Sequence, residues 1–448
     1  MRSSTLWMLR LGRGASARGS VACMDPLSEE LRWRGLVNQL TEPDLSRRLD
    51  HDRVTVYVGF DPTAASLGVG NLLQLCTLRR LQERGHRPIA LAGGGTGSIG
   101  DPGGKSEERP LLTADQLRAN LSGIRPQLER FLDFDAGALL LDNGDWLWGL
   151  GLLEFLRDIG KHFTVNTMVA KETVRARLDA QERSISYTEF SYMLLQAYDF
   201  LHLFDTQGCL LQLGGSDQWG NIVMGVDLIR RVRGAQSFGL TTPLVVKADG
   251  TKFGKTEAGN VWLDPSRTSP YQFFQAFVRT EDSVVGQYLR FFTWLDRPRI
   301  EELEAATSTH PERREAQGVL AREVTTLVHG ETEAARADRA ASLLFSEEIA
   351  GLDEDLLLEL LADAPSTTLP RSDLDGQGLE LVDALVRAGL ASSRSAARNT
   401  IEQGGAYVGN RRETNTSRQL GVGDLLSDRY LLLRKGKRHH HLLVVVAE

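Results

Sequence analysis

The 448-residue sequence has only three cysteines, Cys23, Cys76 and Cys209, too few and too widely separated for a disulfide framework or a cysteine-based metal site. No apolar run approaches the roughly 20 residues that cross a bilayer. Low-complexity tracts and internal repeats of solenoid period are also lacking. These absences predict a globular protein of a reducing compartment, with no membrane partner and no metal held by the protein itself.

Positive charge is not in excess either. The net charge of −7 argues against indiscriminate binding to nucleic acid. Residues 379–448 nevertheless carry eleven Lys/Arg against seven Asp/Glu, whereas the rest of the chain carries 41 against 52. An acidic body with a small basic module is typical of a protein that holds RNA locally, although charge alone fits a solvated surface equally well.

The first 24 residues contain arginines and serines but no acidic residue. This composition fits an organelle transit peptide, and it also fits an upstream start codon with Met24 as the true beginning. We favour the second interpretation because the segment has little amphipathic order. The extension is excluded from the fold in both cases, and we expect a cytoplasmic protein, or a mitochondrial or other organellar one if the segment is a targeting signal.

The hydrophobic pattern after this extension predicts an α/β domain over residues 25–263. Residues 54–60 read as a buried strand, residues 71–84 as a helix, and residues 88–92 as a second strand that ends in a glycine cluster. This order is typical of a Rossmann-like parallel sheet with helices on both faces. Ligands of such sheets bind beyond the carboxyl ends of the strands, where helix N-termini favour phosphate.

The rest of the chain predicts two further domains. Apolar residues at helical spacing indicate a helical domain over residues 264–350, with helices at 271–280, 283–293, 299–306, 311–330 and 331–345. Residues 351–378, with Pro365, Ser366 and Pro370, read as a linker around a short helix. A small α+β module follows at 379–448, with helices at 381–388 and 395–403 and strands at 430–434 and 441–446.

Three motifs carry the chemistry. They are Tyr57-Val-Gly-Phe-Asp61-Pro-Thr63 with the following residues to 71, Gly214-Gly-Ser-Asp-Gln-Trp-Gly-Asn221, and Lys252-Phe-Gly-Lys255-Thr256. Two lysines three apart in a glycine-containing loop can close on polyphosphate, although the pattern is weak by itself. In this order the three segments resemble the class I aminoacyl-tRNA synthetases, and specifically the tyrosyl-tRNA synthetase family. The resemblance runs from about residue 31 to the C-terminus.

One position departs from the family pattern. The family places a HIGH-type motif at a helix start; Gly70 matches it, Asn71 is a common variant of its second histidine, and Gly68 replaces its first histidine. In the family that imidazole donates a hydrogen bond to the phosphates. Losing a bond of ~1.5–3 kcal/mol should slow amino-acid activation by roughly ten- to a hundredfold without abolishing it.

The residues expected to bind tyrosine are easier to recognise. Tyr192, Gln196 and Asp199 are four and three apart, so they share one face of a predicted helix. The resemblance implies that Tyr192 and Gln196 hold the substrate ammonium with Asp101, while Tyr57 and Asp199 meet the phenol hydroxyl. The alternative is a polar stripe on a surface helix.

The resemblance also assigns the remaining site residues. The tyrosine pocket further contains Asn143, Gln212 and Gln218. The ATP-binding residues are Asp61, Gly70, Gly215, Asp217 and Lys255. The catalytic residues are Thr63, Asn71, Lys105, Arg109, Lys252, Lys255 and Thr256. The C-terminal module resembles a ribosomal-type RNA-binding domain, whose phosphate-facing residues are Arg387, Arg394, Arg398, Arg411, Arg412, Lys435, Lys437 and Arg438.

The function that the resemblance implies is ATP-dependent attachment of tyrosine to its tRNA. The expected partners are L-tyrosine, ATP with Mg²⁺, tyrosine tRNA and a second copy of the chain in a homodimer. Gly68 leaves one alternative open, a non-catalytic paralogue that retains RNA binding. Tryptophan as the substrate is disfavoured because Tyr57 and Asp199 form a pair that reads a hydroxyl.

Overall fold

The computed structural model describes residues 25–101, 112–171, 174–175, 178, 185–256, 259–343, 349, 354–361, 364–436 and 439–446. The predicted N-terminal extension lies outside these residues. The chain divides into two compact units, one formed by residues 1–269 and 276–328 and the other by residues 270–275 and 329–448. Within the described part, none of the helices combines the length and apolarity that spanning a bilayer would take.

The first unit is built on a six-stranded sheet in the order β1-β6-β5-β2-β3-β4. Every neighbouring pair is parallel except β1 with β6. The strand order reverses at β2, which lies between β3 and β5, so the carboxyl ends of β2 and β5 form the switch point of the sheet. The predicted α/β class is confirmed. The strands are β1 (Gln39–Leu40), β2 (Thr55–Phe60), β3 (Arg87–Ala92), β4 (Leu139–Asp142), β5 (Cys209–Gly215) and β6 (Phe238–Thr242).

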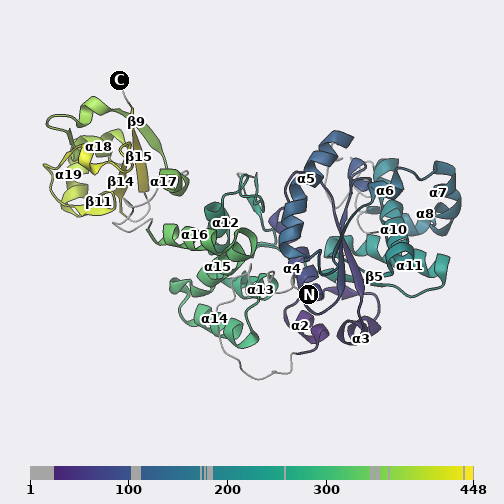
Figure 1. The fold of residues 1–448 in the computed structure, drawn as a ribbon. Coiled ribbons are helices and arrows are strands. Elements are labelled where there is room, and N and C mark those ends of the chain that lie inside the picture. The colour runs from purple at the N-terminus through teal and green to yellow at the C-terminus, as the bar shows by residue number, and fades with distance from the viewer. Residues whose placement is uncertain are drawn as a thin grey trace. The chain divides into compact units, whose positions relative to one another are not determined.

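Helices cover both faces of this sheet (Figure 1). α4 (Val69–Glu83) and α5 (Ala114–Phe131) lie on one face, and α10 (Tyr187–Gln207) and α11 (Trp219–Arg233) on the other. Side chains of β2 alternate between the two layers, so Tyr57 packs with Phe200 of α10 while its neighbours face the α4 side. A strand buried on both faces needs a continuous apolar run, which explains why β2 was recognisable. Shorter helices of this unit are α2 (Leu27–Trp33), α3 (Asp44–His51), α6 (Gly144–Leu147), α7 (Leu152–Asp158) and α8 (Val165–Val169).

The carboxyl end of α4 is joined to the helical part of the chain by buried arginines. Arg80 donates to the carbonyl of Thr293, the residue that caps α13 (Asp282–Phe292), and its guanidinium lies 4.1 Å from the ring centroid of Trp294. Arg34 donates to the same carbonyl at 3.1 Å. Carbonyls at a helix end attract cations, so both guanidiniums are placed where the α13 dipole stabilises them. The further helices are α12 (Pro270–Val278), α14 (Arg297–Thr309), α15 (Glu315–His329) and α16 (Glu331–Leu343).

The C-terminal module contains a five-stranded sheet in the order β12-β11-β14-β15-β9. Helices α18 (Leu381–Arg387) and α19 (Arg394–Glu402) contribute Leu385 and Ile401 to a core shared with the sheet. The predicted linker is wrong in one part, because Ser366–Pro370 forms β9 and pairs in parallel with β15. Only Leu369 of this strand is buried, so the segment has no apolar alternation to reveal it. The other elements are α17 (Glu354–Leu360), β11 (Ala406–Val408), β12 (Arg411–Glu413), β14 (Tyr430–Lys435) and β15 (His439–Val446).

Candidate active site

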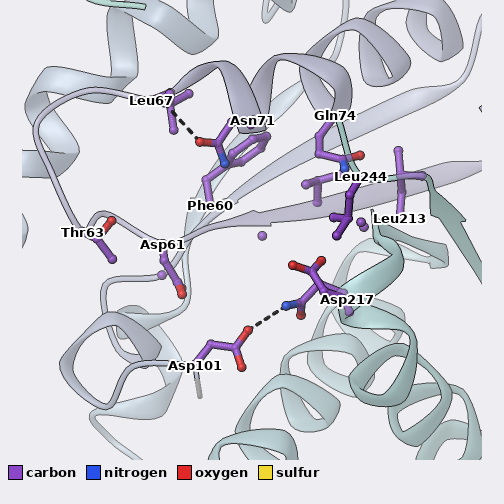
Figure 2. Close-up of a pocket in the computed structure, with 18 of the residues that line it drawn as sticks. Phe60, Asp61, Thr63, Leu67, Asn71, Gln74, Asp101, Leu213, Asp217 and Leu244 are labelled. Carbon is purple, nitrogen blue, oxygen red and sulfur yellow. Dashed lines mark hydrogen bonds between the residues drawn. The ribbon is translucent and has the colours of Figure 1, made fainter. Parts of the chain in front are cut away.

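A cavity of about 420 Å³ opens at the switch point of the sheet, beyond the ends of β2 and β5. Figure 2 shows Asp61, Asp101 and Asp217 around this cavity, with Asn71 and Gln74 of α4 across from the last two. Residues from widely separated segments meet here because the carboxyl ends of parallel strands share one edge of the sheet. The predicted site residues that line the cavity are Tyr57, Asp61, Thr63, Gly70, Asn71, Asp101, Asn143, Tyr192, Gln196, Asp199, Gln212, Gly215, Asp217, Gln218 and Lys252.

Four predicted catalytic residues have no described side chain. Lys105 and Arg109 lie outside the described residues. The backbone of Lys255 and Thr256 forms β7 (Lys255–Thr256), which pairs with β8 (Gly259–Asn260), but their side chains also lie outside the description. The roles of these four residues therefore stay predictions.

The deepest part of the cavity is organised around the carboxylate of Asp199. The Nε1 of Trp146 donates to its Oδ1 at 2.8 Å, and the Nδ2 of Asn143 donates to its Oδ2 at 2.8 Å. Asp199 is 2% exposed, and this burial raises its pKa to about 7, against the lowering effect of the two hydrogen bonds. Trp146 stands three residues after Asn143, and no role for it was predicted from the sequence.

Two buried polar atoms of residues that line the cavity have no hydrogen-bond partner among the described residues, the hydroxyl of Tyr57 and the Oε1 of Gln212. Burial and the charge of Asp199 both raise the pKa of Tyr57, so its phenol stays neutral and can donate. Buried polar groups in proteins are nearly always paired, and an unpaired donor and acceptor inside a cavity indicate a ligand that completes them. A hydroxyl group, which donates and accepts, fits this end of the cavity.

Helix α10 holds three of the predicted residues in the pocket. Its first turn is capped by Ser186, whose hydroxyl accepts from the N–H of Glu189, and it ends at Gly208 with φ of 62°. Tyr192 is 5% exposed and Asp199 2%. The alternative of a polar stripe on a surface helix is therefore wrong, since two of its members are buried against the sheet.

The opposite wall carries amides and carboxylates. Gln218 donates from Nε2 to the Oδ2 of Asp101 at 2.7 Å, and it accepts at Oε1 from the Nε2 of Gln196 at 3.2 Å. The hydroxyl of Tyr192 lies 3.4 Å from both carboxylate oxygens of Asp61. Acceptors for an ammonium group and donors for a carboxylate thus lie side by side, at the other end of the cavity from Asp199.

The phosphate-binding features lie at the start of α4. Its N-terminus borders the cavity, and the positive end of the helix dipole favours anions there, while the N–H of Val69 donates to the carbonyl of Val261 at 3.0 Å. The Nζ of Lys252 lies 3.4 Å from the Oδ2 of Asp217 on the same rim. Gly68 caps this helix, and a Cβ there would meet only the carbonyl oxygen of Val261, at the ordinary contact distance of 3.5 Å. The position of the missing histidine therefore has room for a side chain.

The predicted RNA-contacting residues occupy varied surroundings. Arg387 pairs with Asp373, while Arg394 pairs with Glu380 and Asp383. Other members of the set are Arg412 and Lys435, which donate to backbone carbonyls, and Arg398 and Arg411, which are exposed. Lys437 and Arg438 lie outside the described residues. The part of all eight residues in RNA binding stays a prediction.

Comparison with known proteins places these features in one family. Residues 49–346 match the model of class I tRNA synthetases (W and Y), and residues 359–443 match the tyrosine–tRNA ligase SYY-like C-terminal domain. A tyrosine–tRNA ligase of Roseiflexus castenholzii is 55% identical over 426 residues, which cover 94% of this chain and 100% of the relative. One of Geobacillus stearothermophilus is 49% identical over 425 residues, covering 94% and 99%.

Solved structures give the same result. A C-terminally truncated mitochondrial tyrosyl-tRNA synthetase of Aspergillus nidulans superposes with a TM-score of 0.65 at 31% identity, covering 72% of this chain and 95% of that one. The corresponding protein of Coccidioides posadasii gives 0.62 at 31% identity, covering 75% and 95%.

Replacing Asp199 with Asn should make folding stability less dependent on pH. The pKa of Asp199 is raised from 3.8 to about 7 in the folded protein, so stability is lost as pH rises through this interval. Between pH 5 and pH 7 the wild-type free energy of unfolding should fall by about 2 to 3 kcal/mol more than that of the variant. Urea unfolding followed by tryptophan fluorescence measures both slopes.

The matched control is Asp115→Asn, which removes a carboxylate whose side chain is 89% exposed. This control should keep the wild-type slope. Equal slopes for wild type and Asp199→Asn would show that Asp199 ionises as it does in water.

Proposed function

Because the chain belongs to the class I tRNA synthetases (W and Y), we infer that it is a tyrosine–tRNA ligase that uses ATP. The observation that carries the choice of tyrosine is the buried carboxyl of Asp199 together with the hydroxyl of Tyr57, which has no partner among the described residues; both residues line the cavity. A phenol placed there would donate to Asp199 and accept from Tyr57. Phenylalanine or tryptophan would leave these buried groups without partners, at a cost in binding.

In the first proposed step the carboxylate of tyrosine attacks the α-phosphate of ATP, the bond to the β-phosphate oxygen breaks, and pyrophosphate leaves. The protein supplies position and charge for this displacement. The N-terminus of α4 and Lys252 face the phosphates, and Lys105, Arg109, Lys255 and Thr256 join them as the resemblance implies. Mg²⁺, which we propose arrives with ATP, neutralises phosphate charge.

In the second proposed step a hydroxyl of the 3′-terminal ribose of the tRNA attacks the carbonyl of tyrosyl-adenylate. The acyl–phosphate bond breaks, AMP leaves, and the ribose carries the tyrosyl ester. The basic C-terminal module of residues 379–448 is proposed to bind the tRNA through its arginines, since phosphate contacts supply most of the affinity in such interfaces.

A second candidate function, that of a non-catalytic paralogue that binds RNA, is favoured by one observation. Gly68 stands where the family has the first histidine, so the helix start lacks that imidazole donor to the phosphates. The other cavity residues that the resemblance assigns are present and lie together, which supports the catalytic function. An active ligase would exchange pyrophosphate into ATP, whereas a non-catalytic paralogue would not.

Labelled pyrophosphate should exchange into ATP when tyrosine is supplied, and far less with phenylalanine or tryptophan.

Tyr57→Phe should lower the preference for tyrosine over phenylalanine by roughly 10- to 100-fold, because the donor to the phenol oxygen is lost. The measurement is kcat/KM for exchange with each amino acid. Tyr407→Phe, in the C-terminal module, is the control and should keep the wild-type preference. Exchange at background level, with RNA binding intact, would favour the paralogue.

Gly68→His should raise the exchange rate roughly 10- to 100-fold, because a restored donor would bind the developing charge on the phosphates. The backbone tolerates a side chain there, since an added Cβ would meet only the carbonyl oxygen of Val261, at 3.5 Å. The gain should appear mainly in kcat rather than in the KM for tyrosine. Gly68→Ala is the control and should stay within about twofold of wild type. An equal rate for histidine and alanine variants would mean that another donor already serves the phosphates.

A homodimer is also proposed, on the resemblance and on an exposed apolar segment. Trp148 is 67% exposed, Leu152 71%, Leu153 81% and Val165 63%. Soluble monomers rarely expose so many large apolar side chains within so short a stretch, and such surfaces mark association sites.

Leu153→Asp should convert a dimer into a monomer, because a carboxylate buried without a partner opposes association. Sedimentation velocity across a range of protein concentrations measures the change. Val422→Asp, at another exposed apolar residue, should leave the oligomeric state unchanged. A wild-type protein that sediments as a monomer at all concentrations would contradict the proposed dimer.

A further inference from the structure

Asn221 lies behind the pocket wall, in contact with two of the residues that line the cavity, and has no role in the chemistry described above. Its Nδ2 donates to the Oε1 of Gln196 at 2.9 Å and to the Oε1 of Gln218 at 3.2 Å. Its own Oδ1 accepts from the Nζ of Lys171 at 3.0 Å. Together with the bond from Gln218 to Asp101, these contacts form a continuous chain from Lys171 to Asp101.

The two ends of this chain fix the direction of every amide between them. An ammonium group only donates and an ionised carboxylate only accepts. With its amine charged, Lys171 requires the oxygen of Asn221 to face it, which turns the Nδ2 of Asn221 toward the two glutamine oxygens. Asp101 requires the nitrogen of Gln218, which leaves the oxygen of Gln218 toward Asn221. Both ends specify the same arrangement.

This arrangement gives each glutamine the polarity that an amino acid needs. The Oε1 of Gln196 accepts one bond from Asn221 and keeps a second lone pair, which can accept from an ammonium group. The Nε2 of Gln218 uses one hydrogen on Asp101 and keeps the other, which can donate to a carboxylate. A reversed amide at either position would present a donor to the ammonium or an acceptor to the carboxylate.

Lys171 is costly to hold in this place, which supports a specific use. Burial lowers the pKa of its amine to about 7, against the opposing effect of the Asp101 charge. Its side chain runs beside Gly220, where an added Cβ would lie in ordinary contact with the Lys171 Cε, at 3.5 Å. The lysine thus lies against the start of α11 and reaches Asn221 from there.

We propose that Lys171 and Asn221 are positioning residues that hold Gln196 and Gln218 in the amide orientation required to bind the ammonium and carboxylate groups of the substrate. They act through the glutamines and do not touch the reacting atoms. The inference rests on the proposed function, because it concerns how the same pocket binds an amino acid.

The sharpest test compares Asn221→Asp with Asn221→Ala in tyrosine-dependent pyrophosphate exchange. The aspartate has the shape of asparagine and keeps the contact with Lys171, but it presents an acceptor to two glutamine oxygens. It should raise the KM for tyrosine roughly 30-fold, and alanine only about 5-fold, with the KM for ATP within about twofold of wild type. If Asn221 only fills space, the order reverses and alanine is the more damaging change.

A second test uses a double-mutant cycle with Lys171→Met, which removes the donor and keeps an apolar stem. This variant should raise the KM for tyrosine about 5-fold, and the double variant Lys171→Met/Asn221→Ala should be no worse than Asn221→Ala, because both changes break one chain. Lys161→Met, which removes an exposed lysine, is the control and should match wild type. The preference for tyrosine over phenylalanine should persist in every variant, since the hydroxyl end is separate.

Additive effects on the KM for tyrosine in this cycle would overturn the proposal, and so would equal increases in the KM for tyrosine and for ATP. If Asn221→Asp does not fold, the cycle alone tests the proposal. A wild-type protein without tyrosine-dependent exchange would instead overturn the proposed function. The two failures are therefore distinguishable.

Discussion

The burial of one carboxylate, that of Asp199, constrains the rest of the cavity. An ionisable group at 2% exposure is stable only if neighbouring elements deliver hydrogen bonds to it. Asn143 follows the end of β4 and Trp146 belongs to α6, so the edge of the sheet supplies the partners that Asp199 of α10 needs. The Tyr57 hydroxyl, which has no partner within the described part of the chain, and Asp199 can then both bond to the one hydroxyl of the proposed tyrosine substrate. The proposed selectivity for tyrosine thus comes from buried polar groups that find their hydrogen-bond partner in the ligand.

The cavity therefore separates into two ends with different physics. Around Asp199 the surroundings are nearly dry and a lost hydrogen bond leaves a buried group without a partner. Around Asp101 and Gln218 several amides share bonds in a network, so each group has partners even without a ligand. At the first end, the ligand would supply hydrogen bonds that the protein groups lack. At the second end, it would meet amide groups whose orientation the network already fixes.

The sequence predicted much of this arrangement, and the failures have physical reasons. β2, α4 and β3 were recognisable because their apolar periods are strong, and the structure moves the start of the helix only from 71 to Val69. Many residues around the cavity were recognisable from three motifs, and Asp101, Asn143, Tyr192, Gln196 and Asp199 from the family resemblance. β9 was missed because its stability comes from pairing with β15, which no local pattern records. Trp146 and Lys171 were missed because each owes its place to one tertiary hydrogen bond, and a lysine is ordinarily found at the surface.

Helix α4 connects the cavity to the buried arginine contacts at the end of α13. Its first turn borders the cavity, and its last turns lie against Trp294 and the capped end of α13 through Arg79 and Arg80. Fifteen residues make a rod of roughly 22 Å. Because the Arg80 guanidinium is locked onto a carbonyl that Arg34 also binds, the rod cannot slide along its axis without breaking bonds at its far end. The first turn of α4, which borders the cavity, is consequently held in position by Arg80, Arg34 and the carbonyl of Thr293 at the other end of the helix.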